Sequence, residues 1–468
     1  MRIFDPVHEL IPFEGEHVLF NEKTYEILKE VLDTPEFQRL RRIRQLGFAD
    51  LVYPGATHTR FAHSVGVFKN ARDMLGIAHN HFEKNRHEDK EFDKERARIT
   101  LLAALLHDVG HGPFSHVFEG AMKGIDNDRR SHEWWSMRII GGEGSLNEAL
   151  KRLGREWQIE DFDRKIKNFL GSENKSSDLY TEIVSSQFDA DRMDYLQRDA
   201  YATGIDIGNF DRDWLIDCLR INHETDKPNW VVGLKGRQAV EAYLLARVQL
   251  YESIYLHPTN CGFNIVFRRL MGALSIALKN NDDLPPAVRS NPVVTYLGKV
   301  VKGEEKDLET YLAMDDAAAW MLINTLAADG EGELQRLAGC LASRRPLPFV
   351  RLEPLDPDRP LDEMKNKLAE FGGEIKNKFP LNDWQYDAKP LEIYSLNEED
   401  NSKVYVQGQS GETYALNKIS NLISGLENKA FFYYCRVYFD SKDDHDKHED
   451  DLIEAADRFR ESVRRGTA

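Results

Sequence analysis

LLHDVGHGPFSH, residues 105–116, places three histidines, one aspartate and two glycines at the end of an apolar run. A His-Asp pair alone carries little information, because with 15 histidines in 468 residues about one such pair is expected by chance. His445-Asp446 is another pair, and it lies in the acidic run SKDDHDKHEDD, which predicts a solvated segment. The meaning of the stretch therefore depends on its surroundings and on partners elsewhere in the chain.

The composition is that of a soluble globular protein, with 41% hydrophobic and 30% charged residues. The length predicts about two to three domains. No apolar run approaches the roughly 18 residues of a membrane span, and the N-terminus lacks the pattern of a secretory signal. The four cysteines are far apart, without C-x-x-C spacing, which suits a reducing cytoplasm.

The net charge of -17 repels nucleic acid at long range, so an anionic ligand needs a local cationic pocket. We therefore expect a cytoplasmic protein with neither a membrane nor a nucleic-acid partner. Clustered arginines in a cleft would be informative in such an acidic chain.

Helical periodicity dominates the chain before residue 345. Apolar residues recur at three- and four-residue intervals, with charges between them, in segments near 23–47, 60–85, 96–110, 180–200 and 236–256. DTP at 33–35 predicts a helix start. The glycines and proline after His107 predict the end of the helix that carries it.

The character of the sequence changes near residue 345. PLPFVRLEPLDPDRP (346–360) predicts a connector. Two short strand-like runs bracket GQSGE (408–412), and FFYYCRVYFD (431–440) is a β-prone aromatic run. The tail 449–463 predicts an amphipathic helix that packs onto the body or a sister subunit, with one face formed by Leu452, Ala456, Phe459 and Val463. We therefore predict a mainly α fold, with a helical domain at 1–345 and a smaller mixed α/β subdomain at 346–468.

Three further segments carry polar side chains at helical spacing. HTRFAHSVGV (58–67) places Arg60 and His63 three residues apart, on neighbouring helix faces. If FDADRMDYLQRDAYATGI (188–205) is helical, one face carries Asp191, Tyr195 and Asp199 at i, i+4 and i+8. Arg192 lies beside this face. LLARVQLYESIYLHP (244–258) repeats that spacing with Arg247, Tyr251 and Tyr255.

Histidines and carboxylates from three helices could converge on one cation. The candidates are His63, His107, Asp108 and Asp191. Two imidazoles and two carboxylates suit manganese, iron, zinc, nickel or magnesium and leave coordination positions open for water or substrate. Taken singly, each residue has a plainer interpretation as a core histidine, a loop histidine or an ordinary helix hydrogen bond. The conjunction of all four in order is much harder to produce by chance.

These blocks resemble the HD-domain metal phosphohydrolases. The motif H…HD…D is present as His63, His107-Asp108 and Asp191. DTPEFQRLRRIRQLGFADLVYPGATHTRFAHSVGV (33–67), LLHDVGHGPFSHVFE (105–119) and FDADRMDYLQRDAYATGI are similar to the deoxynucleoside triphosphate (dNTP) triphosphohydrolase branch, which includes the human sterile-alpha-motif and HD-domain enzyme. The resemblance covers about residues 3–265, and it continues more weakly through YLAMDDAAAW (311–320) and the strand-rich C-terminal part. It implies a helical HD-domain core and no sterile-alpha-motif domain.

The resemblance implies a role for each matching residue. The divalent metal ligands would be His63, His107, Asp108 and Asp191. His116 would contact the α-phosphate and His111 would assist the attack or the leaving group, while His132-Glu133 matches a further active-site histidine with its carboxylate. The triphosphate would be held by Arg60, Arg192 and Arg247. Tyr195 and Asp199 would receive the sugar 3′-hydroxyl, Tyr255 would leave little room for a 2′-hydroxyl, and Gln45 and Leu46 would contact the nucleoside. The implied reaction is metal-assisted attack at the α-phosphorus, releasing deoxynucleoside and inorganic triphosphate.

The sequence also departs from the human enzyme's pattern. Arg192 stands where that enzyme has lysine, which keeps the charge and changes the geometry, and Tyr251 replaces a histidine. The N-terminal RIF lacks the asparagine expected before Asp5-Pro6. The positions that read an activating guanine nucleotide, GTP or dGTP, match here as Asp33, Gln38 and Arg41. The alternative for QRLRRIRQ (38–45) is a solvated basic helix face.

Two other functions stay open from the sequence. One is an HD enzyme acting on another nucleotide or on a nucleic-acid 3′ end. The other is a nucleotide-sensing assembly protein that binds without turnover. Members of the family are commonly tetramers or hexamers, so the resemblance also implies a homo-oligomer.

Overall fold

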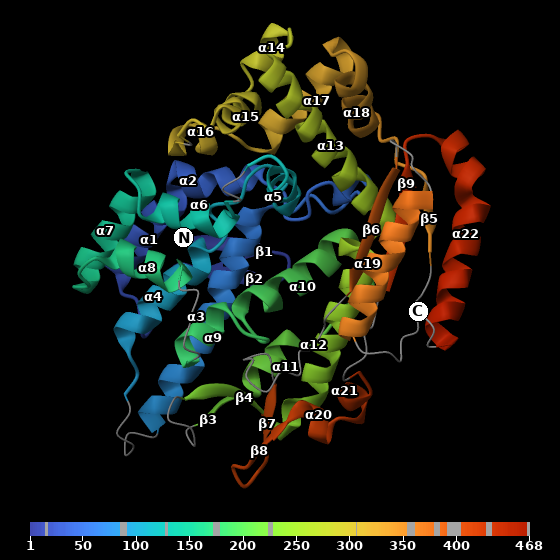
Figure 1. Ribbon diagram of the computed structural model, residues 1–468. Helices are drawn as coiled ribbons and strands as arrows, with labels where there is room; N and C mark the ends of the chain where they lie inside the picture. The colour runs from blue at the N-terminus through green and yellow to red at the C-terminus, as the bar shows by residue number, and fades with distance from the viewer. Residues whose placement is uncertain are drawn as a thin grey trace.

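Figure 1 shows the computed structural model, a helical body with strands and two long helices at one side. The structure describes residues 1–14, 17–84, 91–126, 130–171, 178–222, 228–305, 307–352, 361–378, 384–390, 404–426 and 433–465. The predicted mainly α fold is confirmed.

The elements that build the first half are, in chain order, β1 (Arg2–Asp5), β2 (Glu9–Pro12), α1 (Glu22–Asp33), α2 (Pro35–Gln38), the 3₁₀ turns η1 (Arg39–Arg42) and η2 (Ala49–Leu51), α3 (Arg60–Lys84), α4 (Lys94–Leu106), α5 (His116–Met122), α6 (His132–Ile140), α7 (Ser145–Trp157), α8 (Phe162–Gly171), α9 (Leu179–Val184) and α10 (Ala190–Thr203). The middle of the chain contains α11 (Arg212–Asp217), β3 (Leu219–Asn222), β4 (Asn229–Gly233), the 3₁₀ turn η3 (Leu234–Gly236), α12 (Arg237–Leu250), the π-helical turn η4 (Tyr251–Tyr255), α13 (Pro258–Asn280), α14 (Pro286–Arg289), α15 (Pro292–Lys302), α16 (Leu308–Leu312), α17 (Asp316–Asp329) and α18 (Gly332–Ala342). The remaining elements are β5 (Phe349–Arg351), α19 (Leu361–Lys378), β6 (Trp384–Pro390), β7 (Tyr405–Gln407), β8 (Thr413–Ala415), α20 (Leu416–Ile419), α21 (Asn421–Leu426), β9 (Tyr433–Phe439) and α22 (Lys442–Arg465).

Two of the predicted helical segments are interrupted. The segment predicted at 23–47 breaks at Thr34, whose extended backbone (φ -62°, ψ 142°) is the conformation favoured before a proline. The segment predicted at 180–200 is split into α9 and α10, and Asp189 caps the second helix by accepting the Arg192 N–H. The helix that leads to His107 ends at Leu106, so His107 lies at its C-cap.

The core has two parts, and the stretch 105–116 runs between them. The first cluster packs around α3, α4 and α10 and includes Val109, while the second packs around α13, α15, α17 and α18 and includes Phe114. α4 is buried on all sides near its end, because its run Leu101–Leu106 has no exposed surface. α13 is long and apolar enough to cross a membrane by length and composition, but 61% of that apolar window is buried inside the molecule, as in a core helix.

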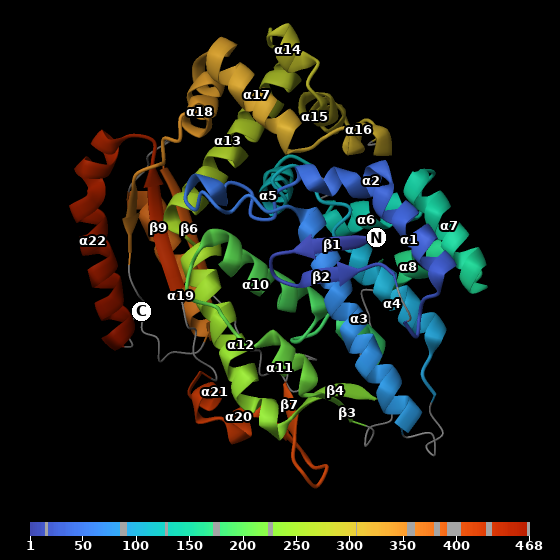
Figure 2. The same ribbon diagram turned by 180° about the vertical axis from the view of Figure 1, so that it is seen from behind.

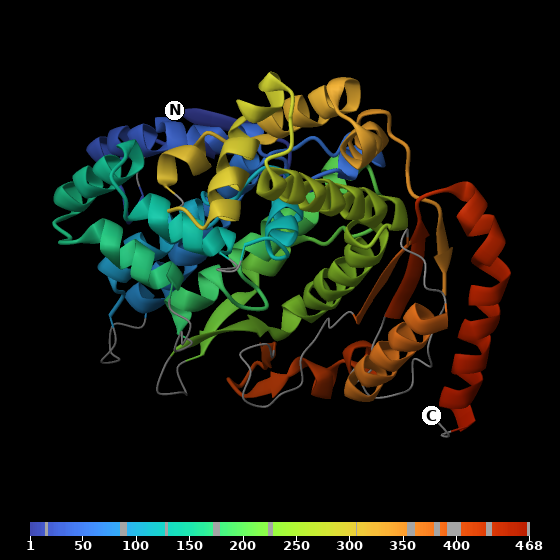
Figure 3. The ribbon, with the colours of Figure 1, turned by 45° about the horizontal axis from the view of Figure 1, so that its top comes forward.

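The C-terminal strands join two different sheets. β7 pairs in parallel with β4, with Val406 opposite Val232, and completes the sheet β3-β4-β7-β8. Strand β9 lies between β5 and β6 in the second sheet, next to α19 and α22 (Figure 3). The predicted hairpin around GQSGE and the strand in FFYYCRVYFD are therefore confirmed. The 404–426 segment contributes to the first core cluster, whereas residues 391–403 lie outside the described residues.

The predicted tail helix is α22. It buries Leu452, Ala456 and Phe459, and Phe459 stacks on Phe371 of α19 at 4.5 Å between ring centroids. The side chain of Val463 lies outside the described residues.

Candidate metal and nucleotide site

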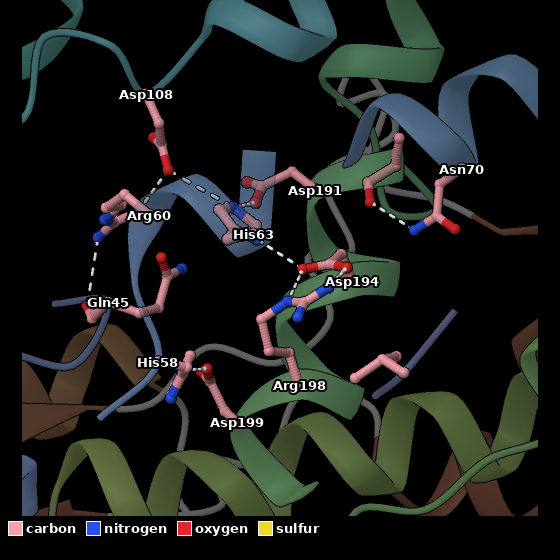
Figure 4. A network of polar contacts seen from close by, with 12 residues as sticks. Gln45, His58, Arg60, His63, Asn70, Asp108, Asp191, Asp194, Arg198 and Asp199 are labelled. Atoms are coloured by element: carbon pink, nitrogen blue, oxygen red, sulfur yellow. Dashed lines mark hydrogen bonds and ion pairs between the residues drawn. The ribbon is translucent and has the colours of Figure 1, made fainter. Parts of the chain in front are cut away.

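Four predicted metal ligands converge from three parts of the chain, and Figure 4 shows three of them, His63, Asp108 and Asp191. His63 lies on α3, His107 and Asp108 follow α4, and Asp191 lies in the first turn of α10. His63 Nε2 is 3.0 Å from Asp191 Oδ1 and 3.5 Å from Asp108 Oδ2. His107 Nε2 is 3.3 Å from Asp108 Oδ1 and 3.7 Å from Asp191 Oδ1.

The two histidines are oriented as metal ligands. His107 Nδ1 is 2.9 Å from the Ala104 carbonyl oxygen, and His63 Nδ1 is 2.7 Å from Asp194 Oδ2. Each Nε2 is buried and has no well-formed hydrogen bond among the described residues. Metal–ligand distances of about 2.0–2.2 Å place adjacent donor atoms roughly 3.0–3.5 Å apart, which matches this spacing. The residues therefore fit a divalent cation.

The carboxylates create a negative potential at the point where the four candidate metal ligands meet. Burial opposes a charge on His63, but contacts with Asp191 and Asp194 outweigh burial and raise the pKa of its imidazole to about 10. Burial likewise opposes a charge on Asp108, but Arg60 and His107 hold the pKa of its carboxyl well below its usual range. The same potential favours a bound cation.

A buried charge network lies directly behind His63. Asp194 has no exposed surface and accepts hydrogen bonds from Arg198 Nε and Nη2, both at 2.8 Å, and lies 2.6 Å from His8 Nε2. Arg198 also donates to Asp5, which lies on the β1–β2 hairpin beside α3 and α10 (Figure 2). This network fixes the orientation of the His63 ring, as carboxylates behind metal-ligating histidines commonly do.

The sequence interpretation missed this network. No local pattern in the sequence links Asp5 and His8 to this site, although Asp194 and Arg198 lie one helical turn apart in FDADRMDYLQRDAYATGI. Gly66 lets α3 and α10 approach, because a Cβ at this position would lie 1.8 Å from Asp194 Oδ1.

Arg60 lies between a metal ligand and the loop before His116. Its Nη1 donates to Asp108 Oδ2 at 2.6 Å, and its Nε donates to Ser115 Oγ at 2.9 Å. The side chain is buried and also lines the pocket described below. Arg60 therefore holds Asp108 as well as facing the pocket.

Three histidines form a second cluster around Glu119. His111 stacks on His132 at 3.9 Å with 12° between the ring planes, and His116 meets both rings edge-on. His132 Nδ1 is 2.9 Å from Glu119 Oε2, and His116 Nδ1 is 3.5 Å from the same oxygen. A metal ion lies close to the plane of each imidazole that binds it. Two stacked imidazoles therefore cannot both bind the same ion well. This arrangement suits proton transfer better than metal binding.

Glu119 is a further residue that the sequence interpretation did not name. Burial opposes its charge, but contacts with His116 and His132 hold the pKa of its carboxyl well below its usual range. Glu133, the predicted partner of His132, is 3.3 Å from Nε2 and mostly exposed. Because LLHDVGHGPFSHVFE places Glu119 one turn after His116, helical spacing was the signal that could have identified it.

A pocket of about 600 Å³ opens over these groups, a volume typical of small-molecule sites. The predicted residues that line it are Gln45, Leu46, Arg60, His107, Asp108, His116, His132, Glu133, Asp191, Arg192, Tyr195, Asp199 and Tyr255. His63 and His111 lie behind the pocket wall, and Arg247 is not among the lining residues of the described chain. Asn260, Asn264 and Tyr251 line the pocket without having been assigned a ligand contact.

The predicted cationic residues are already engaged within the protein. Arg192 contacts Asp189 and the Ser186 carbonyl, and Arg247 donates to Gln187 Oε1 at 2.9 Å. Arg192 faces the pocket from this position, whereas Arg247 lies next to Tyr251.

One wall of the pocket carries a carboxylate, that of Asp199, held by two neighbouring side chains. Tyr255 Oη donates to Asp199 Oδ2 at 2.6 Å, and His58 Nε2 lies 2.8 Å from Asp199 Oδ1. The rings of Tyr195 and Tyr251 lie edge-on to Tyr255, at 6.3 Å and 4.9 Å. The π-helical turn of Tyr251–Tyr255 brings these residues to the pocket, and such turns are frequent at functional sites. His58 was not named from the sequence.

The three predicted activator residues lie near one another at the α1–η1 junction. Asp33 and Arg41 are exposed, and Arg41 Nε donates to Gln38 Oε1 at 2.8 Å. The basic segment is not a uniformly solvated face, because Arg39 is buried and donates to the His111 carbonyl oxygen at 2.8 Å.

The model of the HD domain matches residues 60–199, which contain all four candidate metal ligands. The chain belongs to the HD domain family. It is 29% identical to the uncharacterised protein YwfO of Bacillus subtilis over 91% of this chain and 89% of that one. It is 31% identical to the uncharacterised MG461 homolog of Mycoplasma pneumoniae, over 65% of this chain and 69% of that one.

A deoxynucleoside triphosphate triphosphohydrolase, SAMHD1 of Xenopus laevis, is 33% identical over 47% of this chain and 37% of its own length. The similarity thus spans less than half of that relative. Among solved structures, a phosphohydrolase of Bacteroides thetaiotaomicron has a TM-score of 0.69 at 22% identity, covering 94% of this chain and 99% of its own. A hypothetical protein of Aquifex aeolicus has a TM-score of 0.64 at 26% identity, over 97% of this chain and 99% of its own. These two likenesses establish the fold.

Proposed function

We propose that the protein is a metal-dependent hydrolase that converts a dNTP into a deoxynucleoside and inorganic triphosphate. The observation that carries the proposal is the meeting, at and directly behind the wall of one pocket, of a divalent-metal ligand set, a three-histidine cluster and a carboxylate held by Tyr255. The SAMHD1 proteins of Xenopus laevis, Danio rerio and Gallus gallus, all named deoxynucleoside triphosphate triphosphohydrolases, support the same substrate class.

His63, His107, Asp108 and Asp191 would hold the cation, which is Mn, Fe, Mg, Zn or Ni on ligand chemistry. When bound, it supplies Lewis acidity toward a phosphoryl oxygen. Water adds to the α-phosphorus and the bond to the sugar 5′ oxygen breaks. The deoxynucleoside leaves with a proton, and the triphosphate keeps the oxygen of the attacking water.

His116 is the proton-handling group nearest to the phosphate in this scheme. Its side chain is 66% exposed at the pocket wall, while its Nδ1 faces the buried side of Glu119. Glu119 contacts both His116 and His132, and His111 stacks on His132. Arg60 and Arg192 add positive charge beside the triphosphate.

Asp199 would accept the sugar 3′-hydroxyl. A carboxylate has about four acceptor sites, and Tyr255 and His58 occupy one on each oxygen. The Tyr255 ring fills the space beside this carboxylate, which favours a sugar without a 2′-hydroxyl. Gln45 and Leu46 on the opposite segment would contact the nucleoside.

We also propose control by GTP or dGTP bound at Asp33, Gln38 and Arg41, and assembly into a homo-oligomer. The supporting contact is that of Arg39, which lies between Gln38 and Arg41 in sequence and binds the His111 carbonyl. A ligand on this segment would therefore act one residue away from a group that touches the catalytic loop.

The test is chromatography of purified protein incubated with Mn²⁺ or Mg²⁺ and each dNTP, alone and with GTP or dGTP. We expect deoxynucleoside and triphosphate, lost in His107→Ala and Asp108→Ala. His445→Ala is the matched control, because His445 belongs to the other His-Asp pair, on α22. For the activator, Arg41→Ala should abolish stimulation while Arg42→Ala should not. No product under any pairing, with metal bound, would contradict the proposal and favour another nucleotide substrate or a sensing role.

A further inference from the structure

Asp316 is a buried carboxylate that the proposed chemistry does not use. It is the first residue of α17, a helix that contributes to the second core cluster, and it is 6% exposed. Its Oδ1 accepts the Phe114 N–H at 2.7 Å, and its Oδ2 accepts the Arg44 N–H at 2.9 Å. One side chain from a distant part of the sequence therefore holds the backbone of two separate segments.

Both segments form walls of the pocket. Arg44 directly precedes Gln45 and Leu46, and Phe114 lies two residues before His116. The same segments are joined a second time, because Ser115 Oγ donates to the Arg44 carbonyl oxygen at 2.6 Å. The nucleoside wall and the phosphate-facing wall thus share one hydrogen-bonded junction.

The loop at this junction needs external support. Phe114 and Ser115 both have φ of 57°, in the left-handed region that residues with a Cβ adopt at a cost. Ser115 Oγ also accepts the Arg60 Nε donor, and Arg60 holds Asp108. A shift of this loop would therefore move His116 and the Ser115 hydroxyl that Arg60 contacts, while Arg60 keeps its own bond to Asp108.

Helix capping does not account for Asp316. The N-cap of α17 is its neighbour Asp315, whose Oδ1 accepts the Ala318 N–H at 3.0 Å. Asp315 also pairs with Arg42 at 2.5 Å. The two adjacent aspartates thus make different contacts: Asp315 caps the helix, and Asp316 binds backbone groups of the pocket walls.

We infer that Asp316 is a positioning residue, which holds the loop of Phe114–His116 and the segment of Arg44–Leu46 in register so that His116 faces the substrate phosphate. This inference rests on the proposed function for its effect on turnover. Burial raises the pKa of this carboxyl to about 6, so that at neutral pH it is ionised and accepts both N–H donors.

The experiment compares Asp316→Asn and Asp316→Ala with Asp315→Asn, in the full chain. Asn keeps one acceptor and Ala keeps none, whereas Asp315→Asn changes the same charge one residue away and retains a good N-cap. The measurements are hydrogen exchange of the Phe114 and Arg44 amides, bound metal, and kcat and KM for a dNTP. We expect exchange of these two amides to accelerate at least about 10-fold in the Asp316 variants, more in Ala than in Asn, with metal stoichiometry unchanged.

The expected kinetic effect is a loss of at least about 10-fold in kcat, with KM changed less than about threefold, and no loss in Asp315→Asn. Unchanged exchange at the two amides would overturn the inference. Exchange accelerated evenly across the whole chain, in Asn as in Ala, would also overturn it, because the residue would then be merely structural. If the wild type hydrolyses no dNTP, the proposed function fails, and the exchange data still decide the role of Asp316.

Discussion

The substitution Gly66→Ala tests whether α3 and α10 pack as closely as the structure shows. Gly66 lies one turn after His63 on α3, and its backbone is ordinary helix. Alanine would therefore stabilise the helix by about 1 kcal/mol if there were room for it. There is none, because the new Cβ would lie 1.8 Å from Asp194 Oδ1 and 2.6 Å from Arg198 Nη2.

The magnitude follows from these distances. Ordinary contact begins near 3.4 Å, so the Asp194 carboxylate must move by about 1.6 Å. Its contacts of 2.6 Å with His8 and 2.7 Å with His63 would then be lost. Hydrogen bonds to charged groups contribute about 1.5–3 kcal/mol each, so the net loss in free energy of unfolding is about 2–5 kcal/mol after the gain in helix propensity. Metal affinity should fall about 10- to 100-fold, because His63 loses the carboxylate behind it.

The matched control is Gly76→Ala on the same helix, where no atom lies within 4 Å of the new Cβ. We expect it to raise the free energy of unfolding by about 0.5–1 kcal/mol. Thermal unfolding and metal titration measure both effects; for a chain of this length, about 1 kcal/mol corresponds to about 1 °C in Tm. If Gly66→Ala matches Gly76→Ala in Tm and in metal affinity, then the argument for a close-packed network behind His63 is refuted.

Three further outcomes are expected. Glu119→Gln should lower kcat at least about 10-fold without loss of metal, because His116 and His132 lose their carboxylate; Glu148→Gln on the exposed face of α7 is the control, and an equal effect in both would disprove a specific role. Tyr255→Ala should raise the kcat/KM ratio of ribonucleoside to deoxynucleoside triphosphates by about 10-fold, whereas Tyr255→Phe, which keeps the ring, should not. Because the folded state raises the pKa of Asp316 from 3.8 to about 6, the folded protein binds its proton more tightly than the unfolded chain. The free energy of unfolding should then fall by up to about 3 kcal/mol as pH rises from about 4 to 6, and the fall should be smaller in Asp316→Asn when denaturant unfolding is measured across that range.

The parts of the site that the sequence predicted are those with local patterns. Asp191, Tyr195 and Asp199 follow helical spacing, and α10 does place all three on the pocket. The parts that it missed depend on distant partners. Asp5 and Arg198 are 193 residues apart, and Asp194 is 186 residues from His8, so no local pattern relates them. Only the packing of the hairpin on α10 brings these charges together.

The same reason applies to the fold. Helices that bury one face were predictable from periodicity, whereas the pairing of β4 with β7 joins segments on both sides of the predicted boundary at residue 345. Parallel pairing over such a distance leaves no signal in either strand. The helix start predicted at DTP (33–35) is confirmed, because Pro35 is the first residue of α2 and Thr34, before the proline, is extended.

The balance of charge behind the pocket explains why a divalent cation fits there. The network of touching residues contains four carboxylates, those of Asp5, Asp108, Asp191 and Asp194, and two guanidinium groups, those of Arg60 and Arg198. With neutral histidines as ligands, these described groups leave a deficit of two positive charges. Five of the six are at most 7% exposed, so water screens the deficit poorly. A divalent ion at the point where the imidazoles of His63 and His107 meet Asp108 and Asp191 would cancel it, and a monovalent ion would leave half of it uncompensated.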